Sequence, residues 1–291
     1  MRQTAIAKGD TQLLLTPEEY GYWYREGKRL QDKGYYEDAI VCYDKALITV
    51  RDEYWIWYDR GNTLQNLGRY EEAVSSFEQA LNIRPNDYWS WYYQGCILLE
   101  DLDRFKEAIA SFDRALEVRP GDYWTHFRRG DALRYLQDYS SALIEYDLAL
   151  SCRLDDYWAW FRRGDVLRHL NKYQEAVASY DQALMINPDD FWSYYKLGDT
   201  FRHLQRYQAA IANYQRATQL YPEDEYAWYN YACCAARIGK KSLALECLQE
   251  AIHLNPGKFL IAAKTDSDLD NIRNNQEFND LLSKSDNYSS S

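Results

Sequence analysis

The chain has 291 residues, of which 46% are hydrophobic and 16% aromatic, and its formal net charge is −11. The hydrophobic fraction is enough to bury a core, whereas the acidic balance disfavours general nucleic-acid binding, which needs clustered Lys and Arg. Residues 1–10 lack the apolar stretch of a signal peptide, and no apolar run approaches the ~18–20 residues of a membrane span, so we expect no membrane association.

The first predicted helix begins at Pro17. Residues 16–19 read Thr-Pro-Glu-Glu, a capping box with proline at the first helical position. Leu15 and Tyr20 fit a hydrophobic staple across the same helix start. Residues 1–16 are therefore predicted to form an N-terminal extension.

A pattern then repeats about every 34 residues, which is typical of a helical solenoid. An acidic residue, an aromatic residue and tryptophan recur at 53–55, 87–89, 122–124, 156–158 and 190–192. Glycine and alanine follow the same spacing. The pattern defines seven repeats: 20–53, 54–87, 88–122, 123–156, 157–190, 191–224 and 225–258. Repeat three is one residue longer, and its extra residue lies between Cys96 and Arg104, in the second half of a helix or in its turn.

Each repeat reads as a helical hairpin. In repeat two, apolar residues from Tyr70 to Leu81 recur at intervals of three and four, which indicates one apolar helix face. Pro85 cannot continue that helix, and Asp87 can cap the next one. One hairpin cannot bury its own apolar face, so the hairpins are expected to stack on their neighbours.

This pattern resembles the tetratricopeptide repeat family, whose motif is W-x2-L-G-x2-Y followed by A-x3-F, A and P. Repeat two shows the motif residues Trp57, Gly61, Leu64, Tyr70, Ala73, Phe77, Ala80 and Pro85. The chain departs from the motif at two places. Arginine replaces the leucine before the glycine at Arg60, Arg129 and Arg163, and the closing proline is Arg51 in repeat one and Leu154 in repeat four.

The resemblance implies an all-α fold, a right-handed superhelical solenoid of seven tandem helix-turn-helix repeats over residues 17–258. Phe259-Leu260-Ile261, 270–273 and 277–282 are suited to cover the last hairpin, so we expect capping helices over 259–283. Residues 284–291 are polar and Ser-rich, which predicts a disordered tail.

In the family, the first helix of each repeat lines a concave groove. Counted from the first residue of a repeat, positions 2, 5, 6, 9, 12 and 13 face that groove. The candidate partner-binding residues are aromatic at positions 2 and 5, basic at 6 and 12, and acidic at 9. They are Trp89, Trp124, Phe127, Arg128, Asp131, Arg134, Trp158, Phe161, Arg162, Asp165, Arg168, Trp192, Tyr195, Lys196, Asp199 and Arg202.

Two interpretations remain open for these residues. The tryptophans at position 2 either pack between repeats or form an exposed aromatic ladder. Each Asp at position 9 precedes an Arg by three residues, either as a solvated intrahelical pair worth ~0.2–0.5 kcal/mol or as a means of orienting the Arg toward an incoming carboxylate. Trp at position 4, as in Trp57, matches the packing residue of the family.

The sequence therefore predicts a protein–protein interaction scaffold that holds an extended or helical, acidic partner segment. Single-stranded RNA binding by aromatic stacking in the same groove is the alternative. A chaperone-tail clamp is disfavoured because position 5 is always aromatic. The oligomeric state stays open, since an exposed aromatic groove could also engage the tail of a second copy.

Other classes of function find no support in the sequence. No P-loop, GxSxG, HExxH or dinucleotide fingerprint occurs, so no enzymatic activity is expected. The six cysteines show no CxxC spacing, and His169 and His203 have no evident third ligand. We therefore expect free thiols, a cytoplasmic location, and no metal or other cofactor.

Overall fold

The computed structural model describes residues 17–285. The predicted extension at 1–16, most of the predicted tail, and the capping box and staple that involve Thr16 and Leu15 lie outside the described residues. The chain divides into two compact bodies, residues 1–136 and 137–291, which we call the N-terminal and C-terminal bodies.

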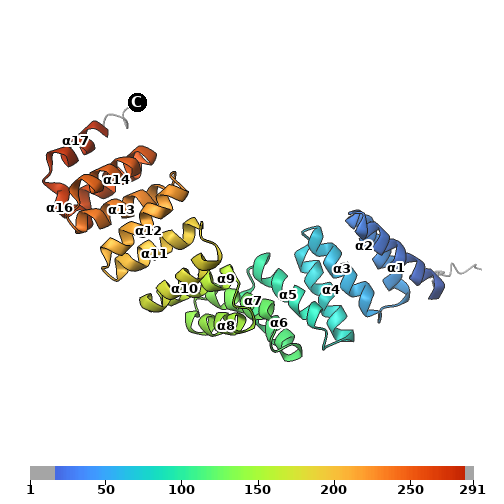
Figure 1. Cartoon of the computed structure of the whole chain (residues 1–291). Coiled ribbons are helices and arrows are strands. Elements are labelled where there is room, and N and C mark those ends of the chain that lie inside the picture. Colours follow the sequence, from blue (N-terminus) through green and yellow to red (C-terminus); the bar gives the residue numbers. More distant parts are fainter. Residues whose placement is uncertain (1–16, 286–291) are drawn as a thin grey trace, which may run out of the picture. The chain divides into compact units, whose positions relative to one another are not determined.

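Each repeat contributes a pair of α-helices (Figure 1). The N-terminal body holds α1 (Pro17–Asp32), α2 (Tyr36–Thr49), α3 (Tyr54–Asn66), α4 (Tyr70–Ile83), α5 (Tyr88–Glu100), α6 (Phe105–Val118) and α7 (Tyr123–Tyr135). The C-terminal body continues with α8 (Tyr139–Cys152), α9 (Tyr157–His169), α10 (Tyr173–Ile186), α11 (Phe191–His203), α12 (Tyr207–Leu220), α13 (Glu225–Arg237) and α14 (Lys241–Leu254). It ends with α15 (Pro256–Thr265), η1 (Ser267–Leu269), α16 (Asp270–Arg273) and α17 (Gln276–Ser285).

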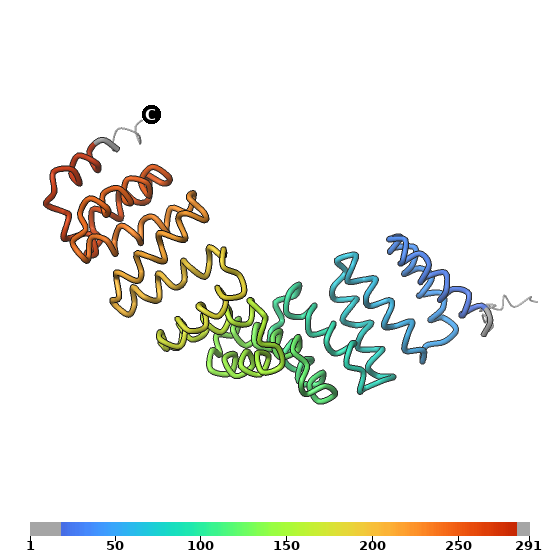
Figure 2. The backbone as a smooth tube through the Cα atoms, viewed as in Figure 1, coloured from blue at the N-terminus to red at the C-terminus, as the bar shows by residue number. Residues whose placement is uncertain are grey.

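The helices pack in chain order within each body (Figure 2). In the N-terminal body α1 packs on α2, α3 on α4 and α5 on α6, and the second helix of each pair also contacts the first helix of the next pair. The C-terminal body repeats this arrangement from α8 to α14. The structure thus confirms, within each body, the predicted all-α solenoid of stacked hairpins. No described helix is long and apolar enough to cross a membrane.

Aspartate starts most of the first helices. The side chain of Asp87 accepts a hydrogen bond from the Ser90 amide at 2.7 Å, which confirms the predicted cap. Asp122, Asp156, Asp190 and Asp224 cap α7, α9, α11 and α13 in the same way. Each cap satisfies an amide of the first turn that has no partner inside the helix.

In four of the described hairpins, tryptophan at position 4 binds the turn before the hairpin. The Trp57 indole donates to the Arg51 carbonyl and the Trp160 indole to the Leu154 carbonyl, each at 2.8 Å. Trp91 and Trp228 make the same bond to the carbonyls of Pro85 and Pro222. Because a backbone carbonyl accepts the bond, the turns that lack the closing proline keep it.

Arginine in place of the motif leucine joins two neighbouring repeats. Arg163 donates to Asp147 on α8 at 2.6 Å and to Ser179 on α10 at 2.7 Å. Arg60 repeats this arrangement with Asp44 and Ser76. The departure from the motif therefore has a structural reason, because the arginine links the second helices of two successive repeats.

The extra residue of repeat three lies in the turn between its two helices. Four residues, 101–104, separate α5 from α6, whereas three residues, 67–69, separate α3 from α4. Asp103 takes a left-handed conformation with φ of 52°, as Gly68 does in the shorter turn with φ of 75°. Of the two predicted locations, the turn is the one observed.

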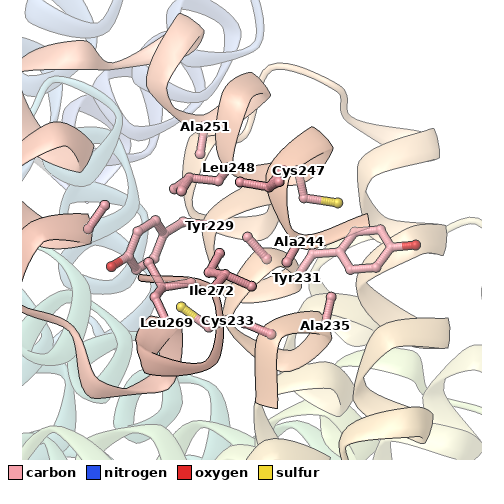
Figure 3. Close-up of a cluster of buried hydrophobic side chains, with 14 of the residues drawn as sticks. Tyr229, Tyr231, Cys233, Ala235, Ala244, Cys247, Leu248, Ala251, Leu269 and Ile272 are labelled. Atoms are coloured by element: carbon pink, nitrogen blue, oxygen red, sulfur yellow. The ribbon is translucent and has the colours of Figure 1, made fainter. Parts of the chain in front are cut away.

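The end of the C-terminal body is covered by its last segments. Leu269 of η1 and Ile272 of α16 are buried in one apolar cluster with residues of α13 and α14 (Figure 3). Phe259 and Leu260 are buried there too, whereas Ile261 is exposed. α15 begins at Pro256, three residues before the predicted cover, and α17 ends at Ser285, two residues into the predicted tail.

Candidate partner-binding surface

The tryptophans at position 2 are about half exposed in both bodies. Trp55, Trp89 and Trp124 of the N-terminal body are 46%, 43% and 48% exposed, and Trp158 and Trp192 of the C-terminal body are each 54% exposed. Each ring meets the preceding aromatic ring edge-on, as Trp158 meets Tyr157 with ring centroids 5.0 Å apart. About half of each ring therefore faces solvent, as an exposed aromatic ladder requires, and its edge packs on an aromatic ring of its own helix.

The aromatic residues at position 5 take a different place from the one expected. Phe127 and Phe161 are only 7% and 6% exposed. The Phe161 ring packs against the buried Tyr180 at 5.7 Å between centroids and lies 6.2 Å from the Trp158 ring. Phe161 therefore supports Trp158 from within the core, while Tyr195 remains half-buried and accepts a hydrogen bond from Asn230.

The charged residues of the N-terminal body are paired with one another. Arg128 on α7 lies 2.6 Å from Glu100 on α5 and 4.0 Å from Asp131. Arg134 lies 3.6 Å from the same Asp131, which is buried. Asp131 thus stands between two guanidinium groups of its own helix, and Glu100 joins this group to the preceding repeat.

In the C-terminal body the charged residues link α9 to α11. Lys196 on α11 lies 3.7 Å from Asp165 on α9, and Arg168 on α9 forms an ion pair with Asp199 on α11. Asp199 also pairs with Arg202 at 3.0 Å. The expected intrahelical pair therefore occurs at Asp199, but the stronger feature is a network between repeats.

Asp165 has a second role that its spacing did not reveal. Its carboxylate accepts a hydrogen bond from the hydroxyl of the buried Tyr180 on α10 at 2.7 Å. Burial, followed by the charge of Asp165, raises the pKa of Tyr180 well above its ordinary value. The phenol therefore stays protonated and acts as a donor that fixes the carboxylate.

Position 13 carries a series of stacked rings that sequence reasoning missed. His169 stacks on Tyr139 with centroids 4.3 Å apart, and His203 stacks on Tyr173 at 5.1 Å. In the N-terminal body Tyr135 stacks on Phe105, also at 5.1 Å. The sequence does contain a signal for these stacks. An aromatic residue begins each of these second helices, and its stacking partner lies at position 13 of the following repeat.

Comparisons with known proteins match these repeats to established families. Models described as tetratricopeptide repeat match residues 54–87 and residues 97–157 and 195–258, and a model described as TPR repeat matches residues 164–202. The chain belongs to the tetratricopeptide repeat family. This family and fold are in general those of protein–protein interaction scaffolds, which are typically not enzymes. The search of curated proteins gave no match.

Solved structures of other tetratricopeptide repeat proteins share the fold. YrrB, described as a TPR protein with an unusual peptide-binding site, is 21% identical with a TM-score of 0.59, over 66% of this chain and 99% of YrrB. MamA from Desulfovibrio magneticus is 18% identical with a TM-score of 0.56, over 60% of this chain and 98% of MamA. A TPR repeat-containing protein from Cytophaga hutchinsonii is 15% identical with a TM-score of 0.67, over 80% of this chain and 96% of the solved part.

One group in this tetratricopeptide repeat protein has the composition of a metal site. The ligand atoms of Cys233, Asp266 and Asp268 lie within 4.8 Å of one another. Asp266 accepts a hydrogen bond from the Tyr229 hydroxyl at 2.9 Å, and Asp268 faces Arg202 at 3.7 Å and Arg237 at 3.8 Å. The arrangement is explained by these partners, which hold the C-terminal cover on α13.

Proposed function

We propose that this tetratricopeptide repeat protein is a scaffold that binds an extended or helical segment of a partner protein on the tryptophans at position 2. The observation that supports it best is the exposure of Trp158 and Trp192, each 54%, at the starts of α9 and α11, two helices that contact each other. Exposed aromatic rings held by a rigid support are what binding hot spots in protein interfaces are made of.

The energy available from these rings is sufficient for a moderate interaction. Covering the exposed half of one tryptophan removes on the order of 100 Å² from water, which contributes about 2.5 kcal/mol. Two such rings would contribute about 5 kcal/mol before the cost of ordering the partner. Phe161 and Tyr195 at position 5 contact these two rings and keep them in place, so little of this energy is lost on binding.

The charges beside the rings favour an acidic partner segment. Four basic candidates of the C-terminal body, Arg162, Arg168, Lys196 and Arg202, accompany two acidic ones, Asp165 and Asp199. Because the acidic side chains already pair with three of these cations, we assign the basic residues to orientation and partner choice. YrrB, whose peptide-binding site is named in its description, provides a precedent for peptide capture on this fold.

The test begins with affinity capture on the full chain and identification of the bound proteins. Binding of a captured partner is then measured for the wild type, the double variant Trp158→Ala/Trp192→Ala, and the control Met185→Ala, which removes an exposed apolar side chain from the second helix of repeat five. We expect the double variant to bind at least about tenfold more weakly and the control to bind normally. Unchanged affinity of a folded double variant would disprove the proposed site, and tight, steeply salt-dependent binding of random RNA would favour the nucleic-acid alternative.

A further inference from the structure

A small polar pocket lies where α9 turns into α10, beside the end of α11. Its volume is about 260 Å³. It is lined by Arg168, His169, Asn171, Tyr173 and His203. This lining, which belongs wholly to the described part of the chain, contains no carboxylate. A pocket with one guanidinium and two imidazoles is suited to a negatively charged group.

The two imidazole rings are held in fixed positions at the edge of this pocket. His203 lies parallel to Tyr173, at 4° between the ring planes, and His169 lies parallel to Tyr139, at 2°. The Tyr173 hydroxyl donates to the Asn171 side chain at 2.8 Å, which fixes the ring beneath His203. Because the supports are rigid, the imidazole nitrogens do not have to be ordered when a ligand binds.

The charged groups around the pocket come from several neighbouring elements. The charged and titratable groups come from α8, α9, α10, α11 and the turn between α9 and α10. They are Tyr139, Asp165, Arg168, His169, Lys172, Tyr173, Glu175, Tyr180, Asp199, Arg202 and His203. Lys172 pairs with Glu175 at 3.8 Å, and Asp199 is shared between Arg168 and Arg202. Asp199 therefore offsets the charge of Arg168 from outside the lining, and the lining itself holds two imidazole rings and no carboxylate.

The next repeat shows which group such a position accepts. Arg202, Tyr207 and Arg237 occupy the positions that Arg168, Tyr173 and His203 occupy one repeat earlier, and the Arg237 guanidinium lies over the Tyr207 ring at 5.5 Å. There the chain supplies its own carboxylate. Asp268 of η1 lies 3.7 Å from Arg202 and 3.8 Å from Arg237.

We propose that the pocket formed by Arg168, His169 and His203 binds an oxyanion, which is a carboxylate or a phosphate group. The guanidinium and the imidazole N–H groups are the donors for its oxygens. The pocket of about 260 Å³ accommodates a single such group and not a large ligand. Asp268 at the following repeat is the internal precedent for the contact.

The position of the pocket also predicts a feature of the partner segment, and this prediction rests on the proposed function. Trp158 and His169 are eleven residues apart on α9, which places them on the same helix face and ~16 Å apart along the axis. An extended chain rises about 3.3 Å per residue. A partner segment whose apolar residue covers Trp158 would thus place an acidic or phosphorylated residue in the pocket about five residues away.

The oxyanion site can be tested without any partner. Inorganic phosphate and, separately, acetate are titrated into the full chain near pH 6.5, while the ring signals of its four histidines are followed by NMR. We expect the signals of His169 and His203 to shift with saturation and those of His126 and His253, which lie outside the pocket, to stay unchanged. Absence of saturable shifts at His169 and His203 with both ions would overturn the proposal.

A matched variant separates the charge of the site from its packing. His203→Tyr introduces the residue that repeat four uses at this position, where Tyr135 stacks on Phe105, so the stack is kept and the imidazole is lost. We expect phosphate binding, read at His169, to weaken by at least about tenfold. Full retention of affinity in the folded variant would count against the site.

The source of the oxyanion and the independence of the two proposals follow from two further measurements. Tighter binding of phosphate than of acetate would assign the pocket to a phosphate group, and comparable binding would assign it to an acidic side chain; both support the site. Trp158→Ala/Trp192→Ala should leave phosphate binding unchanged. If phosphate fails to bind while this double variant loses its protein partner, the oxyanion site is wrong and the proposed function stands.

Discussion

Glycine at position 8 allows the two helices of a repeat to approach closely. A Cβ atom built on Gly164 would lie 2.7 Å from the Tyr180 ring, and one built on Gly198 would lie 2.8 Å from the Tyr214 ring. Both tyrosines are fully buried and cannot move aside without disturbing the core. The glycine is therefore required by packing, since both positions lie within regular helices.

Replacing one of these glycines should destabilise the protein. We expect Gly164→Ala to lower the free energy of unfolding by about 1–3 kcal/mol, the usual cost of overpacking a core. Gly121→Ala is the matched control, because no atom lies within 4 Å of its Cβ position. Denaturant unfolding of the two variants measures the difference. Equal stability of both would contradict the observed approach of α9 and α10.

The aspartate caps can be tested in the same way with adjacent residues. Asp156 accepts a hydrogen bond from the Ala159 amide at 3.0 Å, whereas Asp155 pairs only with the exposed Arg153 at 3.3 Å among its described contacts. We expect Asp156→Ala to cost about 1 kcal/mol and Asp155→Ala to cost much less, because exposed ion pairs contribute little. Urea titrations of both variants provide the comparison, and a larger effect at Asp155 would argue against the cap.

At the level of helices and hairpins, the periodic features could be predicted from the sequence. The recurrence of residues such as Trp57 and Gly61 predicted the repeat length and the hairpin. Asp87 predicted the helix cap, because a cap depends only on residues a few positions away. The burial of Phe161 and the pairing of Arg168 with Asp199 could not be predicted in this way. Both features depend on the angle between neighbouring hairpins, and residue spacing within one hairpin does not predict that angle.

The link between successive second helices gives a prediction at this scale. Arg163→Leu restores the residue of the family motif but removes the bonds to Asp147 and Ser179. Ser179 is buried, although it keeps a bond to the Glu175 carbonyl. We expect a loss of about 1–2 kcal/mol, since hydrogen bonds to charged groups contribute more than neutral ones. Arg163→Lys should recover part of this lost free energy of unfolding. A leucine variant more stable than the wild type in denaturant unfolding would contradict the stabilising role of Arg163.

At the scale of the whole molecule, the cysteines report on the integrity of the stacked repeats. Cys152 is exposed, whereas Cys42, Cys96, Cys233, Cys234 and Cys247 are buried. A thiol reagent added to the folded protein should therefore modify one cysteine rapidly, and all six once the chain is unfolded. Cys152→Ser should remove the rapid phase. Rapid modification of several thiols in the native protein would mean that the repeats do not close over them.

The same thiols predict how stability depends on pH. Burial raises the pKa of Cys96, Cys234 and Cys247 to about 12, whereas thiols of an unfolded chain titrate near pH 8.5. Below that pH both states hold the protons, so these groups cause no pH dependence. Above it the unfolded chain releases protons that the folded chain keeps, and the free energy of unfolding must fall as pH rises toward 12. Denaturant midpoints measured from about pH 7.5 to 10.5 should show this decline, and it should be smaller in Cys247→Ala, corrected for that variant's lower stability at neutral pH. A midpoint that stays constant across this range would show that the thiols are not buried as the structure places them.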